Sequence, residues 1–260
     1  MINLSFSYYD LEYFLLILTR ISCFVFIAPF FSMNNTPRQA KIALSFFTSM
    51  LLYMTLSPAQ AVVYDTVVQY AIIVLKEAIT GLLLGFSTNI CTAIVNFAGN
   101  MVDMETGLSM VTVMDPTTNQ NVSITGALYQ YTVTLLLIVS GMYRYLLGAL
   151  AQSFVVVPVN GAVFHTENLL ATMTSFMVDY IMIGFQICLP VFCVILLLNA
   201  VLGVLAKVSP QMNMFSVGIQ LKILVGVSVL FFTFSMLPDA TEYIFNEMKK
   251  MTVSFVEGMI

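Results

Sequence analysis

The stretch VFCVILLLNAVLGVL, from Val191 to Leu205, decides the fold class of this chain. It carries no charged residue and is apolar on every face that a helix would present. It lies inside a longer apolar run, Ser175 to Ala206, and a membrane-spanning helix needs about 20 mainly apolar residues. A transmembrane β-barrel would instead show short segments of alternating polarity. The stretch therefore predicts an α-helix that spans a membrane.

The composition extends this prediction to the whole chain. Of its 260 residues, 60% are hydrophobic and 8% are charged, and the mean hydropathy is +0.96. So little polar surface cannot cover a soluble domain of this length. Five further apolar segments approach or exceed spanning length: Leu11 to Phe31, Ala40 to Leu56, Val67 to Phe97, Ile124 to Ala149 and Val217 to Leu237. We expect an all-α integral membrane protein, with residues 1–260 forming one domain of about six long hydrophobic helices.

The residues that catalysis and cofactor binding need are scarce. The single histidine is His165, and the four cysteines (Cys23, Cys91, Cys188 and Cys193) lie in apolar runs without a CxxC pair. No nucleotide-binding, zinc-protease or serine-hydrolase motif is present. The net charge of −4 argues against a nucleic-acid partner. We therefore expect no enzyme activity, no metal and no cofactor.

Three ionisable residues, Arg20, Lys76 and Glu77, lie within apolar segments. Each such residue costs about 2.5 to 3.5 kcal/mol at the centre of a spanning helix. A transporter could use Glu77 in a proton or ion relay, but a relay generally needs several carboxylates or histidines along a path. We favour the alternative that these residues make polar contacts to neighbouring helices.

Small residues and one proline mark possible packing and bending positions. Gly81 and Gly85 have the small-xxx-small spacing that lets another helix approach closely. Packing within the chain and packing between subunits both fit that spacing. Pro190 predicts a kink in the fifth segment, which is either an ordinary bend or a moving hinge.

A polar island, AGNMVDMETGLSMVTVMDPTTNQNVS from Ala98 to Ser123, separates the third and fourth apolar segments. It contains acidic residues, glycines and four methionines: Met101, Met104, Met110 and Met114. Methionine is unbranched and packs against irregular partners. We expect a loop at about this position that could seal an opening; the alternative is an ordinary connection between helices.

A second polar stretch, KVSPQMNMFSVGIQLK from Lys207 to Lys222, follows the fifth segment. Its proline, amides and glycine predict a chain reversal between the fifth and sixth helices.

Residues spread over most of the chain resemble those of the FliR family, the export-gate membrane subunit of bacterial flagellar type III secretion, which is homologous to the SctT-type subunit of injectisomes. The matching residues are Arg20, Pro29, Pro37, Lys41, Glu77, Gly81, Gly85, Ala98, Gly99, Asp103, Gly107, Asp115, Pro116, Ser153, Phe154, Pro158, Pro190, the SPQMN run at 209–213, Gly218 and Lys222. Two departures stand out. The family often has a histidine pair where this chain has Met142 to Arg144, and a proline where it has Gln220.

The resemblance implies helical hairpins packed in a helical export-gate assembly in the bacterial inner membrane, at the flagellar basal body. The partners would be FliP- and FliQ-type subunits, FlhB- and FlhA-type subunits, membrane lipid and unfolded export substrates. The loop within residues 99–123 would plug the pore, through Gly107, Met110, Met114, Asp115 and Pro116. Contacts between subunits would involve Gly81, Gly85, Pro210, Gln211 and Asn213.

Three alternatives to a flagellar gate subunit stay open. They are a gate subunit of a virulence-type apparatus, a transporter of small solutes or ions, and a purely structural nucleus on which other gate subunits assemble.

Overall fold

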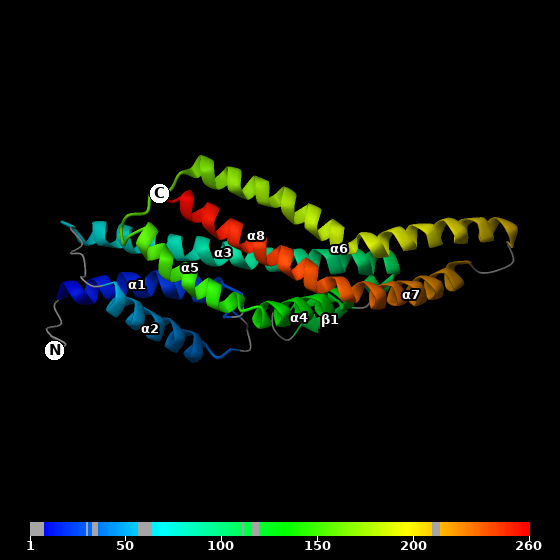
Figure 1. Cartoon of the computed structure of the whole chain (residues 1–260), viewed down its shortest axis with the longest axis horizontal. Coiled ribbons are helices and arrows are strands. Elements are labelled where there is room, and N and C mark those ends of the chain that lie inside the picture. Colours follow the sequence, from blue (N-terminus) through cyan, green and yellow to red (C-terminus); the bar gives the residue numbers. More distant parts are fainter. Residues whose placement is uncertain are drawn as a thin grey trace. The chain divides into compact units, whose positions relative to one another are not determined.

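The computed structural model describes residues 8–29, 31–32, 36–56, 64–110, 112–115, 120–209 and 214–260. These residues form eight α-helices, two short 3-10 helices and one antiparallel hairpin (Figure 1). The α-helices are α1 (Tyr8–Ile27), α2 (Arg38–Thr55), α3 (Val67–Thr106), α4 (Ile124–Val139), α5 (Met142–Val156), α6 (Thr166–Val208), α7 (Met214–Thr233) and α8 (Leu237–Glu257). The 3-10 helices are η1 (Leu108–Met110) and η2 (Phe234–Met236), and the strands are β1 (Thr112–Asp115) and β2 (Gln120–Ser123). The predicted all-α class is confirmed.

The chain divides into two compact units. The first unit comprises Met1–Ile90, Gly141–Ser175 and Glu247–Ile260, and the second comprises Cys91–Ser140 and Phe176–Asn246. The helices α3, α6 and α8 each contribute residues to both units. That the whole chain acts as one membrane domain stays a prediction.

In the first unit, α2 packs on α1 with its polar face inward. Lys41, Ser45 and Ser49 are buried, whereas Phe47 on the opposite side of α2 is exposed. The two serine hydroxyls donate hydrogen bonds to backbone carbonyls of their own helix, so they need no outside partner. Small side chains on this face allow close helix packing, which is the arrangement expected when the outer surface is itself apolar.

In the second unit, the C-terminal part of α3 packs against α6. Val102 of α3 forms a buried cluster with Cys188, Val191 and Ile195 of α6. The Tyr180 hydroxyl also donates a hydrogen bond of 3.3 Å to the Ala93 carbonyl. The stretch Val191 to Leu205, which predicted a membrane-spanning helix, thus supplies part of the core.

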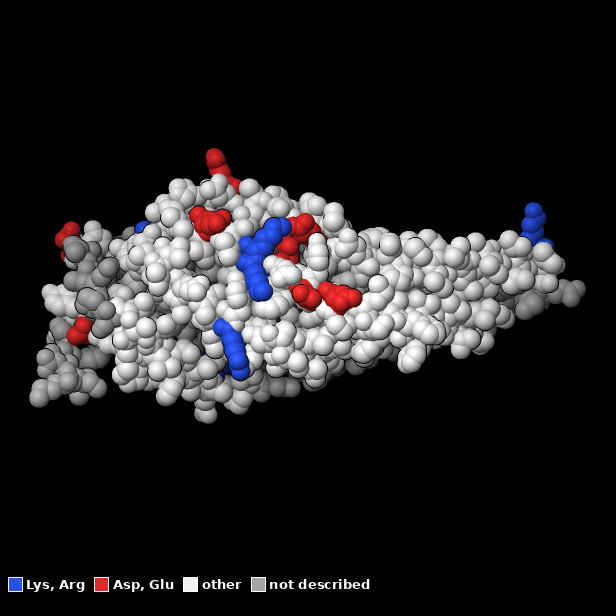
Figure 2. All heavy atoms as spheres, viewed as in Figure 1, with Lys and Arg blue, Asp and Glu red and all other residues white. Residues whose placement is uncertain are grey.

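Within the described residues, three helices are long and apolar enough to cross a membrane: α3, α6 and the continuous run Val217–Glu257. The count rises to four if the broken pair α4 and α5 forms one span. Large apolar side chains on these helices are exposed, for example Leu197, Phe231 and Phe232. Charged side chains are few on the face that Figure 2 shows. These features are those of a multi-pass membrane protein.

Two predicted segments differ from the observed helices. The fourth segment is not one helix: it breaks between α4 and α5 at Gly141, whose φ of +80° is a left-handed conformation that favours glycine. The sequence analysis also missed α8, because Glu242, Glu247 and Lys249 interrupt its apolar residues. An amphipathic helix of this kind does not register as an apolar run.

Candidate functional site

Arg20 and Glu77 form a fully buried ion pair in the first unit. The Arg20 Nε donates a hydrogen bond of 2.6 Å to Glu77 Oε2, and neither side chain is exposed to solvent. The backbone N–H of Asn160 donates to the other carboxylate oxygen at 2.9 Å. Both oxygens of Glu77 are therefore occupied by donors, which does not favour a proton or ion relay at this residue.

The Arg20 guanidinium also binds the C-terminal end of α5. Its Nη1 donates to the carbonyls of Val157 (2.9 Å) and Ser153 (3.3 Å), and the group lies 4.3 Å from the ring centroid of Phe154. A cation is favourable there because a helix C-terminus carries partial negative charge and free carbonyls. The prediction that Arg20 and Glu77 make polar contacts to neighbouring segments is confirmed.

Gly81 and Gly85 lie against α1 of the same chain. A Cβ atom at Gly81 would lie 2.2 Å from the Arg20 carbonyl oxygen, and one at Gly85 would lie 3.1 Å from the Phe24 carbonyl oxygen. The small-xxx-small spacing allowed packing within the chain or packing between subunits, and the structure shows packing within the chain. The predicted contact between subunits at these two glycines would require α1 to move away from this face of α3.

The polar island is partly helical. The expectation of a loop beginning at Ala98 is wrong for residues 98–106, because α3 continues to Thr106. The helix ends at Gly107, which has a φ of +84° and no atom within 4 Å of where a Cβ would lie. After η1, the strands β1 and β2 pair antiparallel from Thr112↔Ser123 to Asp115↔Gln120, and β2 leads directly into α4.

Several predicted site residues cannot be placed fully. Pro116, Pro210, Gln211 and Asn213 lie outside the described residues. The backbones of Met110, Met114 and Asp115 belong to η1 and β1. Their predicted roles stay predictions.

A buried carboxylate joins the two ends of this loop. Asp103, in the last turn of α3, is fully buried. Its Oδ2 accepts a hydrogen bond of 3.1 Å from the backbone N–H of Thr125, and its Oδ1 accepts one from the Thr125 hydroxyl. Because Thr125 lies in the first turn of α4, the carboxylate meets the partial positive charge of a helix N-terminus. Ser123 caps the same helix by accepting a hydrogen bond from the Gly126 N–H at 3.1 Å.

Glycines bring α3 and α4 close enough for this contact. A Cβ at Gly99 would lie 2.3 Å from the Gly126 Cα, so the two backbones touch. Two turns beyond Gly99 on α3, Cγ2 of Thr106 lies 2.4 Å from where a Cβ at Gly226 of α7 would be. We call Gly99, Asp103, Thr125 and Gly126 the loop-base clamp. It fixes both ends of the segment 107–122 on packed helices.

The sequence analysis did not predict the clamp. Asp103 and Thr125 are 22 residues apart in the chain, and their pairing depends on the close approach at Gly99. One local signal was present, since Ser123 immediately before an apolar run is a typical helix N-cap. It predicts the start of α4 but not the partner of Asp103.

Comparison with known proteins gives the family. A family model described as "Bacterial export proteins, family 1" matches residues 11–248. The chain is 30% identical over 236 residues to the flagellar biosynthetic protein FliR of Bacillus subtilis (strain 168), covering 90% of each chain. The chain belongs to the FliR family.

Other FliR relatives agree over similar lengths. The Escherichia coli (strain K12) protein is 22% identical over 242 residues, covering 93% of this chain and 92% of its own. The Aquifex aeolicus (strain VF5) protein is 26% identical over 242 residues, covering 92% of each. This FliR-family chain is therefore a flagellar export protein, as expected for a subunit of the flagellar type III export gate.

We predict that Arg20 and Glu77 stabilise the chain only as a pair. Arg20→Met or Glu77→Met alone should cost about 3 to 5 kcal/mol, because each leaves an uncompensated buried charge. The double variant should lose clearly less than the sum of the two. Thermal unfolding of the purified gate complex measures this, with Arg38→Met, an exposed arginine on α2, as the control. Additive losses would show that the two residues act independently.

We also predict that the α3 and α4 contact does not tolerate a methyl group. Gly99→Ala should lower thermal stability by about 1 to 3 kcal/mol, because the new Cβ would overlap the Gly126 backbone. Gly203→Ala is the matched control, since nothing lies within 4 Å of its Cβ position on α6. It should be neutral or slightly stabilising, as alanine favours helices over glycine. Equal behaviour of the two variants would contradict the contact.

Proposed function

We propose that this chain forms, with FliP- and FliQ-type subunits, the inner-membrane channel of the flagellar type III export gate. In this proposal the segment Gly107–Val122 is the closure of the channel, and FlhB- and FlhA-type subunits are further partners. Unfolded export substrates pass when the segment moves. The observation that carries the proposal is the loop-base clamp, which tethers the segment at both ends to packed helices.

The segment itself combines firm anchors with weak internal structure. A two-stranded hairpin is at best marginally stable alone, so β1 and β2 can rearrange at small cost. Gly107 joins the segment to α3 through a conformation that leaves it free of neighbouring atoms. The segment can therefore change shape while the helices at its base keep their positions.

The residues of the segment suit a closure. Met110 and Met114 carry flexible thioether side chains that pack against irregular surfaces, such as the inside of a pore. Passage of an unfolded chain requires no covalent chemistry from this subunit.

Shortening the segment within 107–122 should leave assembly intact and make the membrane leak ions and small solutes. Met110→Asp with Met114→Asp should leak as well but less, because carboxylates draw water into an apolar seal. The measurement is membrane conductance, or influx of a small solute, in cells that express the whole gate. Purification of the complex from the same cells checks that it forms.

The control for the methionine variant is Met104→Asp. Met104 is exposed on α3, just before the segment, and does not belong to the proposed closure. It should not leak. A shortened segment that assembles and stays as tight as the parent would show that 107–122 is only a connection between helices.

The proposed partners predict a second outcome. The chain expressed alone should be unstable or polydisperse in detergent, because large apolar side chains on α6 and α7 are left uncovered. Co-expression with FliP- and FliQ-type subunits should give one defined particle. A monodisperse chain that never co-purifies with them would contradict the assembly. A tight particle that no variant makes leaky would instead favour the purely structural role.

A further inference from the structure

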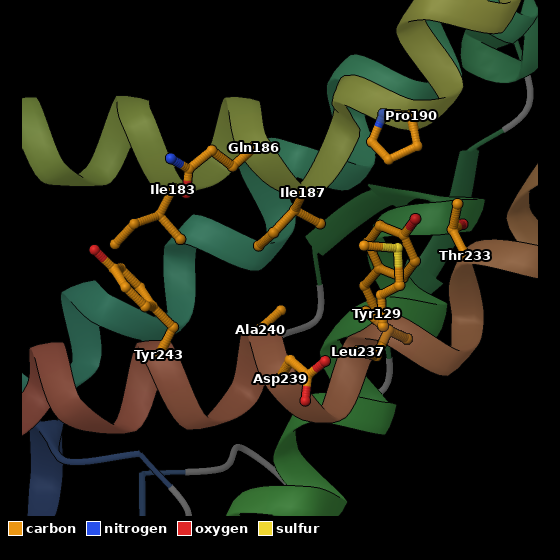
Figure 3. Close-up of a pocket in the computed structure, with 11 residues that line it drawn as sticks. Tyr129, Ile183, Gln186, Ile187, Pro190, Thr233, Leu237, Asp239, Ala240 and Tyr243 are labelled. Atoms are coloured by element: carbon orange, nitrogen blue, oxygen red, sulfur yellow. The ribbon is translucent and has the colours of Figure 1, made fainter.

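A pocket opens in the second unit where two long helices are irregular (Figure 3). On one side, α6 contains Pro190. On the other, the run from α7 to α8 passes through the 3-10 turn η2. Tyr129 of α4 also lines the pocket. Irregular helices do not pack ridge into groove, and a cavity of about 230 Å³ remains between them.

The inner part of the pocket is apolar. Ile183, Leu237 and Tyr129 line it and are buried, and Ile187 and Ala240 extend the same surface. In Figure 3 the side chains of Ile183 and Ile187 point from α6 toward α8. The cavity is smaller than the sites of drug-sized ligands, which occupy about 300 to 1,000 Å³, so it suits a small ligand. The apolar part suits an alkyl chain or a ring.

The polar groups around it include both donors and acceptors, and Asp239 is the one ionised group among the lining residues. The Gln186 backbone carbonyl lacks its helical donor, because Pro190 has no N–H. The Thr233 hydroxyl already donates to the Leu230 carbonyl and shares a hydrogen bond with the Tyr129 hydroxyl. Asp239 adds a carboxylate, and none of the 11 lining residues is Lys, Arg or His. The pocket is therefore suited to a donor with positive charge.

The Asp239 carboxylate is the residue that favours a positively charged ligand. It is exposed in the first turn of the amphipathic helix α8. In the described part of the chain it has no ion-pair partner. A carboxylate beside an apolar wall attracts a ligand that joins a positive charge to an apolar part.

We propose that this pocket binds an organic monocation, a protonated amine carried on an apolar chain or ring. The ammonium group donates a hydrogen bond to Asp239, and the apolar part lies against Ile183 and Leu237. The site is separate from the loop-base clamp, and the proposal does not depend on the role of the segment 107–122.

The test is photolabelling of the assembled gate with an octylammonium probe whose chain carries a diazirine. Label should be found by mass spectrometry in peptides containing residues 183–190 and 236–243. Unlabelled octylammonium should compete at about tenfold lower concentration than octanoate, because only the ammonium is attracted by the carboxylate. 1-Octanol should fall between them.

Three variants make the test specific. Asp239→Asn should remove the preference for octylammonium over octanoate while labelling persists, and Ala240→Phe should fill the pocket and abolish labelling. Glu242→Gln is the matched control, because Glu242 is an exposed acid on α8 that does not line the pocket. It should change neither result.

Several outcomes would overturn the proposal. Label spread over the exposed apolar helices would indicate partition into the detergent rather than a site. Equal competition by octylammonium and octanoate would exclude recognition of charge. Labelling of the isolated chain that disappears in the assembled gate would show that a neighbouring subunit, and not a small cation, occupies the pocket.

Discussion

The hydrogen bonds between the buried carboxylate of Asp103 and Thr125 are the interaction on which the functional account depends. An unpartnered charge at this depth would be strongly unfavourable, so the position of α4 follows from where Asp103 lies. Two further conditions make the contact possible. Gly99 and Gly126 let the backbones touch, and Ser123 caps α4 so that its first turn presents the Thr125 N–H. The loop therefore leaves the helices at Gly107 and returns at Ser123.

The first unit uses the same physical arrangement with different residues. There a buried arginine is neutralised by Glu77 and by the carbonyls at the end of α5, and Gly81 lets α3 approach the Arg20 backbone. In an apolar surrounding, burial of hydrophobic surface does not by itself choose one helix arrangement over another. Close backbone contact and satisfied polar groups make that choice. Buried polar residues in this chain thus specify helix positions, and the structure gives no reason to assign them to ion transport.

The sequence predicted the helices that are apolar throughout, and it did so because length and hydropathy suffice for them. It underestimated α3, because the polar residues near Asp103 resemble a loop until their partner on α4 is known. It missed the break at Gly141, since the chain is apolar on both sides of that residue. The sequence analysis missed the amphipathic α8 because charged residues lie between the apolar residues of its buried face, so no continuous apolar run is present.

The sequence analysis also could not predict contacts between residues that are distant in the chain. Arg20, Glu77 and Asp103 were each recognisable as unusual, and the family resemblance rested partly on them. Their partners could not be read from one sequence, because the Arg20 and Glu77 pair spans 57 residues and the Asp103 and Thr125 pair spans 22. The family assignment rests on the comparisons, whereas the loop-base clamp required the structure.

The central claim is that the base of the loop stays fixed while the segment 107–122 moves. The most direct measurement is flagellar protein export through a gate that carries Asp103→Cys and Thr125→Cys, compared before and after oxidation of this pair to a disulfide. The single variant Asp103→Cys controls for loss of the carboxylate and for oxidation of other cysteines. The account predicts that the oxidised and reduced gates export at the same rate, because the cross-link holds only what already stays together. Export that stops on oxidation and returns on reduction would contradict it, since the base itself would then have to open.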